Sequence, residues 1–202
     1  MCSGPRPRVD SMSLALLVLG ICSFLFHATM RATLEFADEL GMLGLAWSFL
    51  QATLTARQPP RKSALVNAAL AVFVASFSGF YVYSGKIIYH VIAFGTMMVL
   101  VFLRGLYLFH RVDPPLPREK CRDWNVRMFR AAGIVLFGYF LWHVDLELCA
   151  ELRALREQVG LPWAWFFELH GWWHVLTAIG AGWFADVARE IRRELEMEKK
   201  AE

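Results

Sequence analysis

The chain has 202 residues, of which 57% are hydrophobic and only 19% are charged, and its formal net charge is +3. Soluble domains contain about 45–50% apolar residues even when glycine is counted, so this composition favours a multi-span membrane protein. The small net charge, without a basic stripe interleaved with aromatic residues, argues against a nucleic-acid partner. The four cysteines form no CxxC pair and predict no disulfide framework.

Six stretches approach the ~20 apolar residues that a helix needs to cross a bilayer. They lie at about 12–30, 36–55, 63–83, 87–109, 128–148 and 163–185. The loop 110–127, with its three prolines and many charges, is expected to be a solvated connection, and the charged tail 186–202 a helical extension into water. The sequence therefore predicts an all-α fold, a polytopic transmembrane bundle of six spans in one domain covering 1–202.

Basic residues predict the orientation of these spans. With six spans, both termini and the loops at 56–62 and 110–127 share one side, which carries fifteen lysines and arginines. The opposite side carries four, namely Arg31, Lys86, Arg153 and Arg156. Cytoplasmic loops are the ones enriched in Lys and Arg, so we expect both termini to be cytoplasmic.

Polar residues within the apolar stretches predict the functional site. His27 closes the first span, Asp38 opens the second, and His170 and His174 open the sixth, so all four are expected near the non-cytoplasmic face. A charged side chain at the centre of a membrane helix costs roughly 3 kcal/mol or more, which makes such residues functional candidates by default.

The spacing of these residues is typical of metal ligands. His170 and His174 lie four apart, so they share one helix face and can hold one metal. Ser23 and His27 repeat that spacing, and Asp38 follows eleven residues after His27. Three histidines with an open fourth position are typical of a catalytic zinc site, where the carboxylate of Asp38 can reach the metal-bound water.

Other interpretations of these polar residues stay open at this point. The HxxxH pair can also bond to backbone carbonyls or anchor an interface, with Trp172 and Trp173 in an aromatic belt. His90 and Arg104 in the fourth span can form a polar pair for substrate or for packing. Asp145 either supports a metal-binding histidine or faces water at the end of its span.

Two separated motifs resemble the signatures of the alkaline ceramidase family, within a wider group that includes the adiponectin and progestin receptors. "SFLFHATMRATLEFADEL" is similar to the first signature, and the resemblance implies a functional serine at Ser23, a zinc ligand at His27 and the family aspartate at Asp38. "HGWWHVLTAIG" is similar to the second and implies zinc ligands at His170 and His174. The resemblance runs from about residue 18 to 185.

The resemblance implies zinc-dependent hydrolysis of the amide bond of ceramide, a lipid, to a sphingoid base and a free fatty acid. Zinc-activated water would be the nucleophile, Asp38 the general base and acid, and Ser23 the oxyanion donor. It further implies an endoplasmic reticulum or Golgi membrane.

The family has seven spans and an acidic N-terminal run that binds Ca²⁺. In "MCSGPRPRVDSMS" only Asp10 is a carboxylate, so we expect the first family helix and the calcium site to be missing. A receptor-like or scaffolding member of the same zinc-containing group, or an inactive truncated form, is the alternative. The sequence predicts no oligomeric state.

Overall fold

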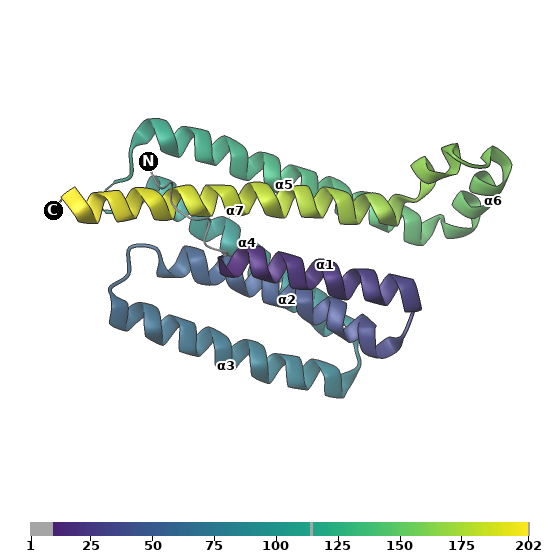
Figure 1. Ribbon diagram of the computed structural model, residues 1–202, viewed down its shortest axis with the longest axis horizontal. Coiled ribbons are helices and arrows are strands. Elements are labelled where there is room, and N and C mark those ends of the chain that lie inside the picture. Colours follow the sequence, from purple (N-terminus) through teal and green to yellow (C-terminus); the bar gives the residue numbers. More distant parts are fainter. Residues whose placement is uncertain (1–9, 114, 202) are drawn as a thin grey trace, which may run out of the picture. The chain divides into compact units, whose positions relative to one another are not determined.

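The structure, a computed structural model, describes residues 10–113 and 115–201, and the regular secondary structure of these residues is helical (Figure 1). In chain order the elements are α1 (Ser11–Thr29), α2 (Ala32–Thr55), α3 (Pro60–Ser84), α4 (Ile87–His110), α5 (Arg118–Glu147), α6 (Cys149–Val159), the 3₁₀ helix η1 (Trp163–Phe167) and α7 (Leu169–Ala201). The prediction of an all-α fold is confirmed.

Four helices, α1, α3, α4 and α5, are long and apolar enough to cross a membrane, judged by length and composition among the described residues. Helices also form at the other two predicted spans, but α2 and α7 fall short of that standard. In each the apolar run is interrupted by the polar residues of interest, Asp38 and Glu39 in α2 and His170 and His174 in α7. The predicted count of six spans is therefore not confirmed.

Two connections differ from the prediction. The loop after α4 is much shorter than 110–127, because α5 already begins at Arg118, directly after Pro117. The charged residues that follow are compatible with a helix, and an ion pair of 2.8 Å joins Asp123 and Arg127 one turn apart. The segment between α5 and α7 contains α6 and η1, which were not predicted because neither contains a long apolar run.

The chain divides into two compact units. The first contains the described residues up to Leu116 together with those from Ala188 onward, and the second is Pro117–Val187. The boundary falls within α7, so this helix contributes its N-terminal part to the second unit and its C-terminal part to the first. Each unit is described by itself.

In the first unit α2 is the central helix and packs against α1, α3 and α4. Its residues Leu43, Ala46 and Phe49 are at most 2% exposed and form much of the core. Helices α1 and α2 approach closely at Gly41, where a Cβ atom would lie 3.2 Å from the Cα of Leu19. α3 is capped by Gly85, whose φ of 62° is the left-handed conformation that glycine adopts without strain.

The C-terminal part of α7 is also bonded within the first unit. The guanidinium of Arg189 donates to the carboxylate of Asp10 at 2.6 Å and to the hydroxyl of Ser13, while Arg57 pairs with Glu198 at 2.8 Å. Asp10 also caps α1 by accepting from the Ser13 backbone N–H at 2.8 Å. The tail is thus helical, as predicted, but it is not wholly solvated, because these ion pairs and the buried Ile191 hold it.

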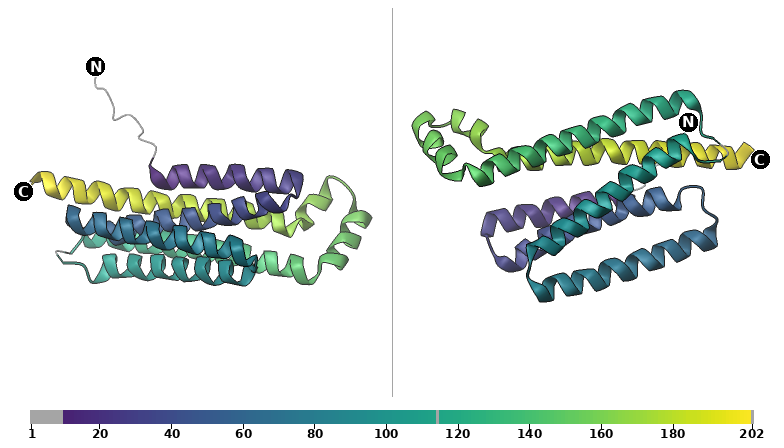
Figure 2. Two further views of the ribbon diagram at one scale, coloured as in Figure 1. Left: turned by 90° about the horizontal axis from the view of Figure 1, so that it is seen from below. Right: turned by 180° about the vertical axis from the view of Figure 1, so that it is seen from behind.

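In the second unit α5 and the N-terminal part of α7 lie side by side and antiparallel (Figures 1 and 2). Glycine permits this close approach. A Cβ atom on Gly180 would lie 2.6 Å from the Cγ2 of Val135 and 3.0 Å from the carbonyl oxygen of Ala131. On α5, a Cβ atom on Gly138 would lie 3.2 Å from the Cβ of Leu176. α6 folds back against η1 and leads the chain into α7.

Candidate active site

The first unit brings three of the five predicted site residues together. Met30 takes a left-handed φ of 53° and ends α1, and α2 begins at Ala32, so the chain reverses within a very short turn. Asp38, in the second turn of α2, therefore returns to the level of Ser23 and His27. Its side chain is 9% exposed, accepts a hydrogen bond from the Ser23 hydroxyl and interacts electrostatically with the His27 ring.

A second polar group occupies the neighbouring side of α2. Glu39 accepts a hydrogen bond from the hydroxyl of Tyr81, which joins α2 to the last turn of α3. The Tyr81 ring also packs against Phe36, with 5.5 Å between ring centroids, and against His90, with 5.6 Å. Sequence reasoning missed Glu39 and Tyr81. The tandem of Asp38 and Glu39 in an apolar stretch was the available signal.

His90 and Arg104 take separate partners within the first unit. His90 is 4% exposed and packs between the rings of Tyr81 and Phe94. Arg104 donates to the backbone carbonyl of Thr53 at 3.3 Å, and its guanidinium lies over the Tyr107 ring. Neither residue pairs with the other in these contacts, and the buried Nδ1 of His90 has no hydrogen-bond partner among the described residues, so a role in substrate binding stays a prediction beside packing.

The second unit contributes the two histidines of α7. His170 and His174 lie on one face of the helix in its first turns, and their Nε2 atoms face each other at 2.9 Å. Two nitrogens bound to a tetrahedral zinc at about 2.0–2.1 Å are separated by about 3.3 Å. A small rotation of either imidazole therefore suffices for both nitrogens to bind one metal, so this pair fits the predicted role.

Aromatic packing between α5 and α7 holds this pair in place. Trp142 of α5 stacks on Trp173 at 6.0 Å and contacts the His170 ring edge-on at 6.5 Å between centroids. Behind them, the hydroxyl of Thr177 donates to the backbone carbonyls of Trp173 and His174. The orientation of the imidazoles thus depends on contacts that the HxxxH spacing alone does not reveal.

Asp145 does not bond to a histidine in these contacts. Its carboxylate lies 3.9 Å from Arg156, a residue of α6 that sequence reasoning treated only as a loop charge. Arg156 also lies 3.3 Å from Glu168 and donates to the backbone carbonyl of Phe167 at 3.0 Å, directly before α7. Asp145 thus belongs to the group of charges at the entry into α7.

The predicted loss of the calcium site concerns mainly residues 1–9, which lie outside the described residues. Asp10, the one carboxylate of the run 1–13, is described and bonds to Arg189. Burial by itself raises the pKa of Asp10, but the hydrogen bonds from Arg189 and Ser13 lower that pKa to about 2.

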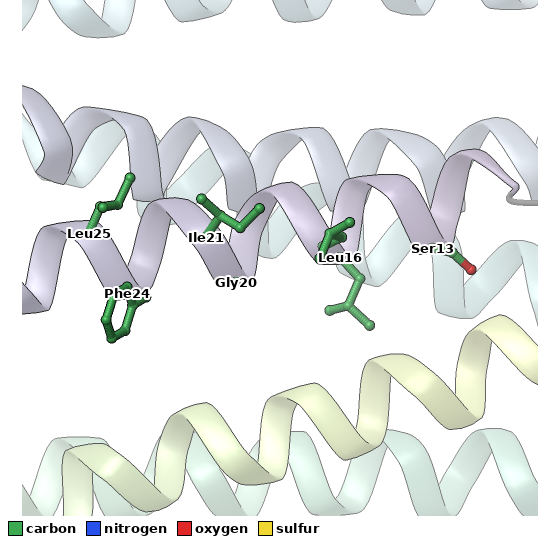
Figure 3. A pocket seen from close by; sticks show the side chains of 7 residues that line it. Ser13, Leu16, Gly20, Ile21, Phe24 and Leu25 are labelled. Carbon is green, nitrogen blue, oxygen red and sulfur yellow. The ribbon is translucent and has the colours of Figure 1, made fainter.

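One face of α1 carries an apolar hollow of about 520 Å³ (Figure 3). It is lined by Ser13, Leu16, Leu17, Gly20, Ile21, Phe24 and Leu25. Gly20 deepens it, because no atom lies within 4 Å of where its Cβ would be. Apart from the Ser13 hydroxyl the side chains are hydrocarbon, so the hollow suits an apolar ligand such as a lipid chain.

Comparison with known proteins places the chain in a family. The model of the family described as Ceramidase matches residues 3–202. Alkaline ceramidase YPC1 of Saccharomyces cerevisiae is 29% identical over 179 residues, which cover 81% of this chain and 55% of the yeast protein. Alkaline ceramidase 3 of Mus musculus is 26% identical over 184 residues, which cover 88% of this chain and 66% of the mouse protein. The chain spans only these parts of its relatives, but the family model matches it almost throughout, and the chain therefore belongs to the ceramidase family.

Proposed function

We propose that this protein is a zinc-dependent amidohydrolase of the membrane that cleaves the amide bond of ceramide to a sphingoid base and a free fatty acid. Membership of the ceramidase family supports the substrate and suggests a metal. The observation that carries the zinc dependence is the pair of Nε2 atoms facing each other at 2.9 Å on α7.

His27, His170 and His174 are proposed to hold the Zn²⁺ ion. The first belongs to one compact unit and the other two to the second unit, so their joint role stays a prediction. Three imidazoles leave one coordination position open, as catalytic zinc sites require. When bound, zinc polarises carbonyl oxygens and lowers the pKa of a bound water to about 7.

Asp38 is proposed as the general base and acid. Its carboxylate is nearly buried, which keeps bulk water from competing for the proton, and it lies beside Ser23 and His27. In that position it can accept a proton from the attacking water and return it to the leaving amine. In this proposal Asp38 transfers protons and the histidines bind the metal.

Ser23 is proposed as the oxyanion donor. Its hydroxyl now donates to Asp38, and a hydroxyl has one proton to give. Rotation of the Ser23 side chain would redirect that proton to the amide oxygen as negative charge develops there, once Asp38 has accepted a proton from water. A donor of this kind contributes about 3–4 kcal/mol to transition-state stabilisation.

A lipid substrate agrees with the apolar surfaces of the chain. The hollow on α1 continues to Phe24 and Leu25, which directly follow Ser23 in the sequence, so a hydrocarbon chain lying there would bring its polar end towards the catalytic residues. An endoplasmic reticulum or Golgi membrane, with both termini in the cytoplasm, belongs to the same proposal.

The decisive experiment measures bound zinc and ceramide hydrolysis on the same purified full chain in lipid nanodiscs. We expect about one zinc per chain and chelator-sensitive release of fatty acid. His174→Ala should lose both zinc and activity, whereas Asp38→Asn should keep zinc and lose turnover. His110→Ala, an exposed histidine at the end of α4, is the matched control and should retain both.

The possible results separate this proposal from its competitor. Bound zinc without hydrolysis of any ceramide would favour a receptor-like or scaffolding role. Hydrolysis that survives chelation and the His174→Ala substitution would overturn the metal mechanism.

A further inference from the structure

The segment that leads into α7 exposes an unusual amount of aromatic surface. We name Leu161–Phe167 the aromatic turn. The most exposed apolar side chains of this turn are Leu161 at 79%, Trp163 at 62%, Trp165 at 74% and Phe166 at 58%. Tryptophan and phenylalanine exposed to this extent in adjacent positions mark an interaction surface rather than a connection chosen for solubility.

Hydrogen bonds fix the backbone of the aromatic turn, and ring contacts fix the orientation of its side chains. Arg156 of α6 donates to the carbonyl of Phe167 at 3.0 Å, and the indole N–H of Trp172 donates to the carbonyl of Phe166 at 3.2 Å. The rings of Trp163, Phe166 and Trp172 form a stack with centroid separations of 6.1 and 6.4 Å. Two hydrogen bonds and a ring stack thus keep the aromatic face of the turn outward.

We propose that the aromatic turn is inserted into the interfacial region of the lipid bilayer and anchors the N-terminal end of α7 at headgroup depth. Indole rings prefer that layer because their apolar body and polar N–H match its two sides. The short helix α6 separates the turn from α5, a helix apolar enough to span a membrane, whose last residues include the exposed Leu146. Exposed apolar side chains therefore lie on both sides of α6 in the sequence, at the end of α5 and in the turn.

The charges of α6 favour a lipid surface over a second protein as the occupant. Leu152 of this short helix is buried, while Glu151, Arg153 and Glu157 are exposed, and the helix packs against η1 of the aromatic turn. Opposite charges next to tryptophans suit the zwitterionic headgroup layer. The core of a protein interface, by contrast, is depleted of charge.

Anchoring of the turn has a consequence for the histidines of α7. Only two residues separate the end of the turn from His170, and Trp172 of the same helix bonds back to the carbonyl of Phe166. Insertion of the turn would therefore set the depth of His170 and His174 at the level where a lipid carries its amide. This consequence rests on the proposed function, whereas the insertion itself does not.

Fluorescence of the full chain in nanodiscs tests the insertion. Subtracting the emission of Trp165→Phe from that of the wild type isolates Trp165, which is 74% exposed in the structure. We expect blue-shifted emission, strong quenching by phosphatidylcholine brominated high on its acyl chains, and weak quenching by aqueous iodide. Quenching by iodide alone would overturn the proposal in favour of a solvated turn. Protection from both quenchers would also overturn it, in favour of a protein partner or a second copy.

Hydrolysis tests the consequence for the active site. Trp163→Ser with Trp165→Ser should raise the KM for long-chain ceramide in vesicles at least several-fold, with unchanged zinc content and kcat for a short-chain soluble analogue. Trp163→Phe with Trp165→Phe should restore the KM, and Phe73→Ser on α3 is the control for loss of an exposed aromatic side chain. An unchanged KM would refute the link to the active site. If the wild type hydrolyses no ceramide, the proposed function fails while the quenching experiment still decides the insertion.

Discussion

Replacement of Gly180 by alanine should loosen the contact of α5 and α7 that supports the two histidines. The added Cβ would lie 2.6 Å from Val135 Cγ2 and 3.0 Å from the carbonyl oxygen of Ala131. The side chain of Val135 can rotate away, but the carbonyl belongs to the backbone of α5 and yields only if the helices separate. Overpacking of this kind costs about 1–3 kcal/mol.

Gly182 is the matched control, because it lies two residues further along α7 and no atom lies within 4 Å of where its Cβ would be. Alanine is favoured over glycine within a helix by about 1 kcal/mol, and both variants receive that gain. Their difference therefore isolates the steric cost, so we expect Gly180→Ala to be about 1–3 kcal/mol less stable than Gly182→Ala.

Unfolding in mixed micelles titrated with a denaturing detergent and followed by far-UV circular dichroism measures this difference. Bound zinc should fall as well, since Gly180 lies about 9 Å along the helix from His174 and a shift of α7 carries that ligand with it. The second substitution Val135→Ala should recover part of the loss. If Gly180→Ala equals Gly182→Ala in stability and zinc content, the close approach of α5 and α7 is wrong.

Two further predictions concern the first unit. Tyr81→Phe removes the hydroxyl that donates to Glu39 and leaves a half-buried carboxylate without that partner, so we expect the unfolding free energy to fall by about 1.5–3 kcal/mol. Glu39→Gln should lose less stability, because the amide oxygen of the new side chain can still accept from Tyr81. The pKa of Asp10 is lowered from an ordinary 3.8 to about 2. The ion pair of Asp10 with Arg189 therefore stabilises the folded chain above pH ~4, and this stabilisation is lost as the pH falls towards 2. Asp10→Asn should abolish that part of the acid dependence, worth at most about 1 kcal/mol for a partly exposed pair, and an acid titration of stability identical in the two proteins would contradict this assignment.

The sequence predicted the helices well where hydrophobicity alone decides them. The stretches 63–83 and 87–109 correspond closely to α3 and α4, because a long apolar run leaves a helix as the one way to satisfy its backbone in a membrane. The prediction was wrong where helices are built from charged residues. The first turns of α5 and all of α6 carry no apolar run, and their helices depend on bonds such as Asp123–Arg127 and Arg156–Phe167, which sequence hydropathy does not register.

For the candidate site, the sequence by itself determined which residues share one face of a single helix. Four residues on a helix place His170 above His174 whatever the surrounding fold, so their convergence was predictable. Tertiary structure alone decided that the Ser23 hydroxyl donates to Asp38, that Tyr81 bonds to Glu39 and that Asp145 serves Arg156. Each of these contacts joins helices whose relative rotation and depth follow from packing, and no spacing within a single helix carries that information.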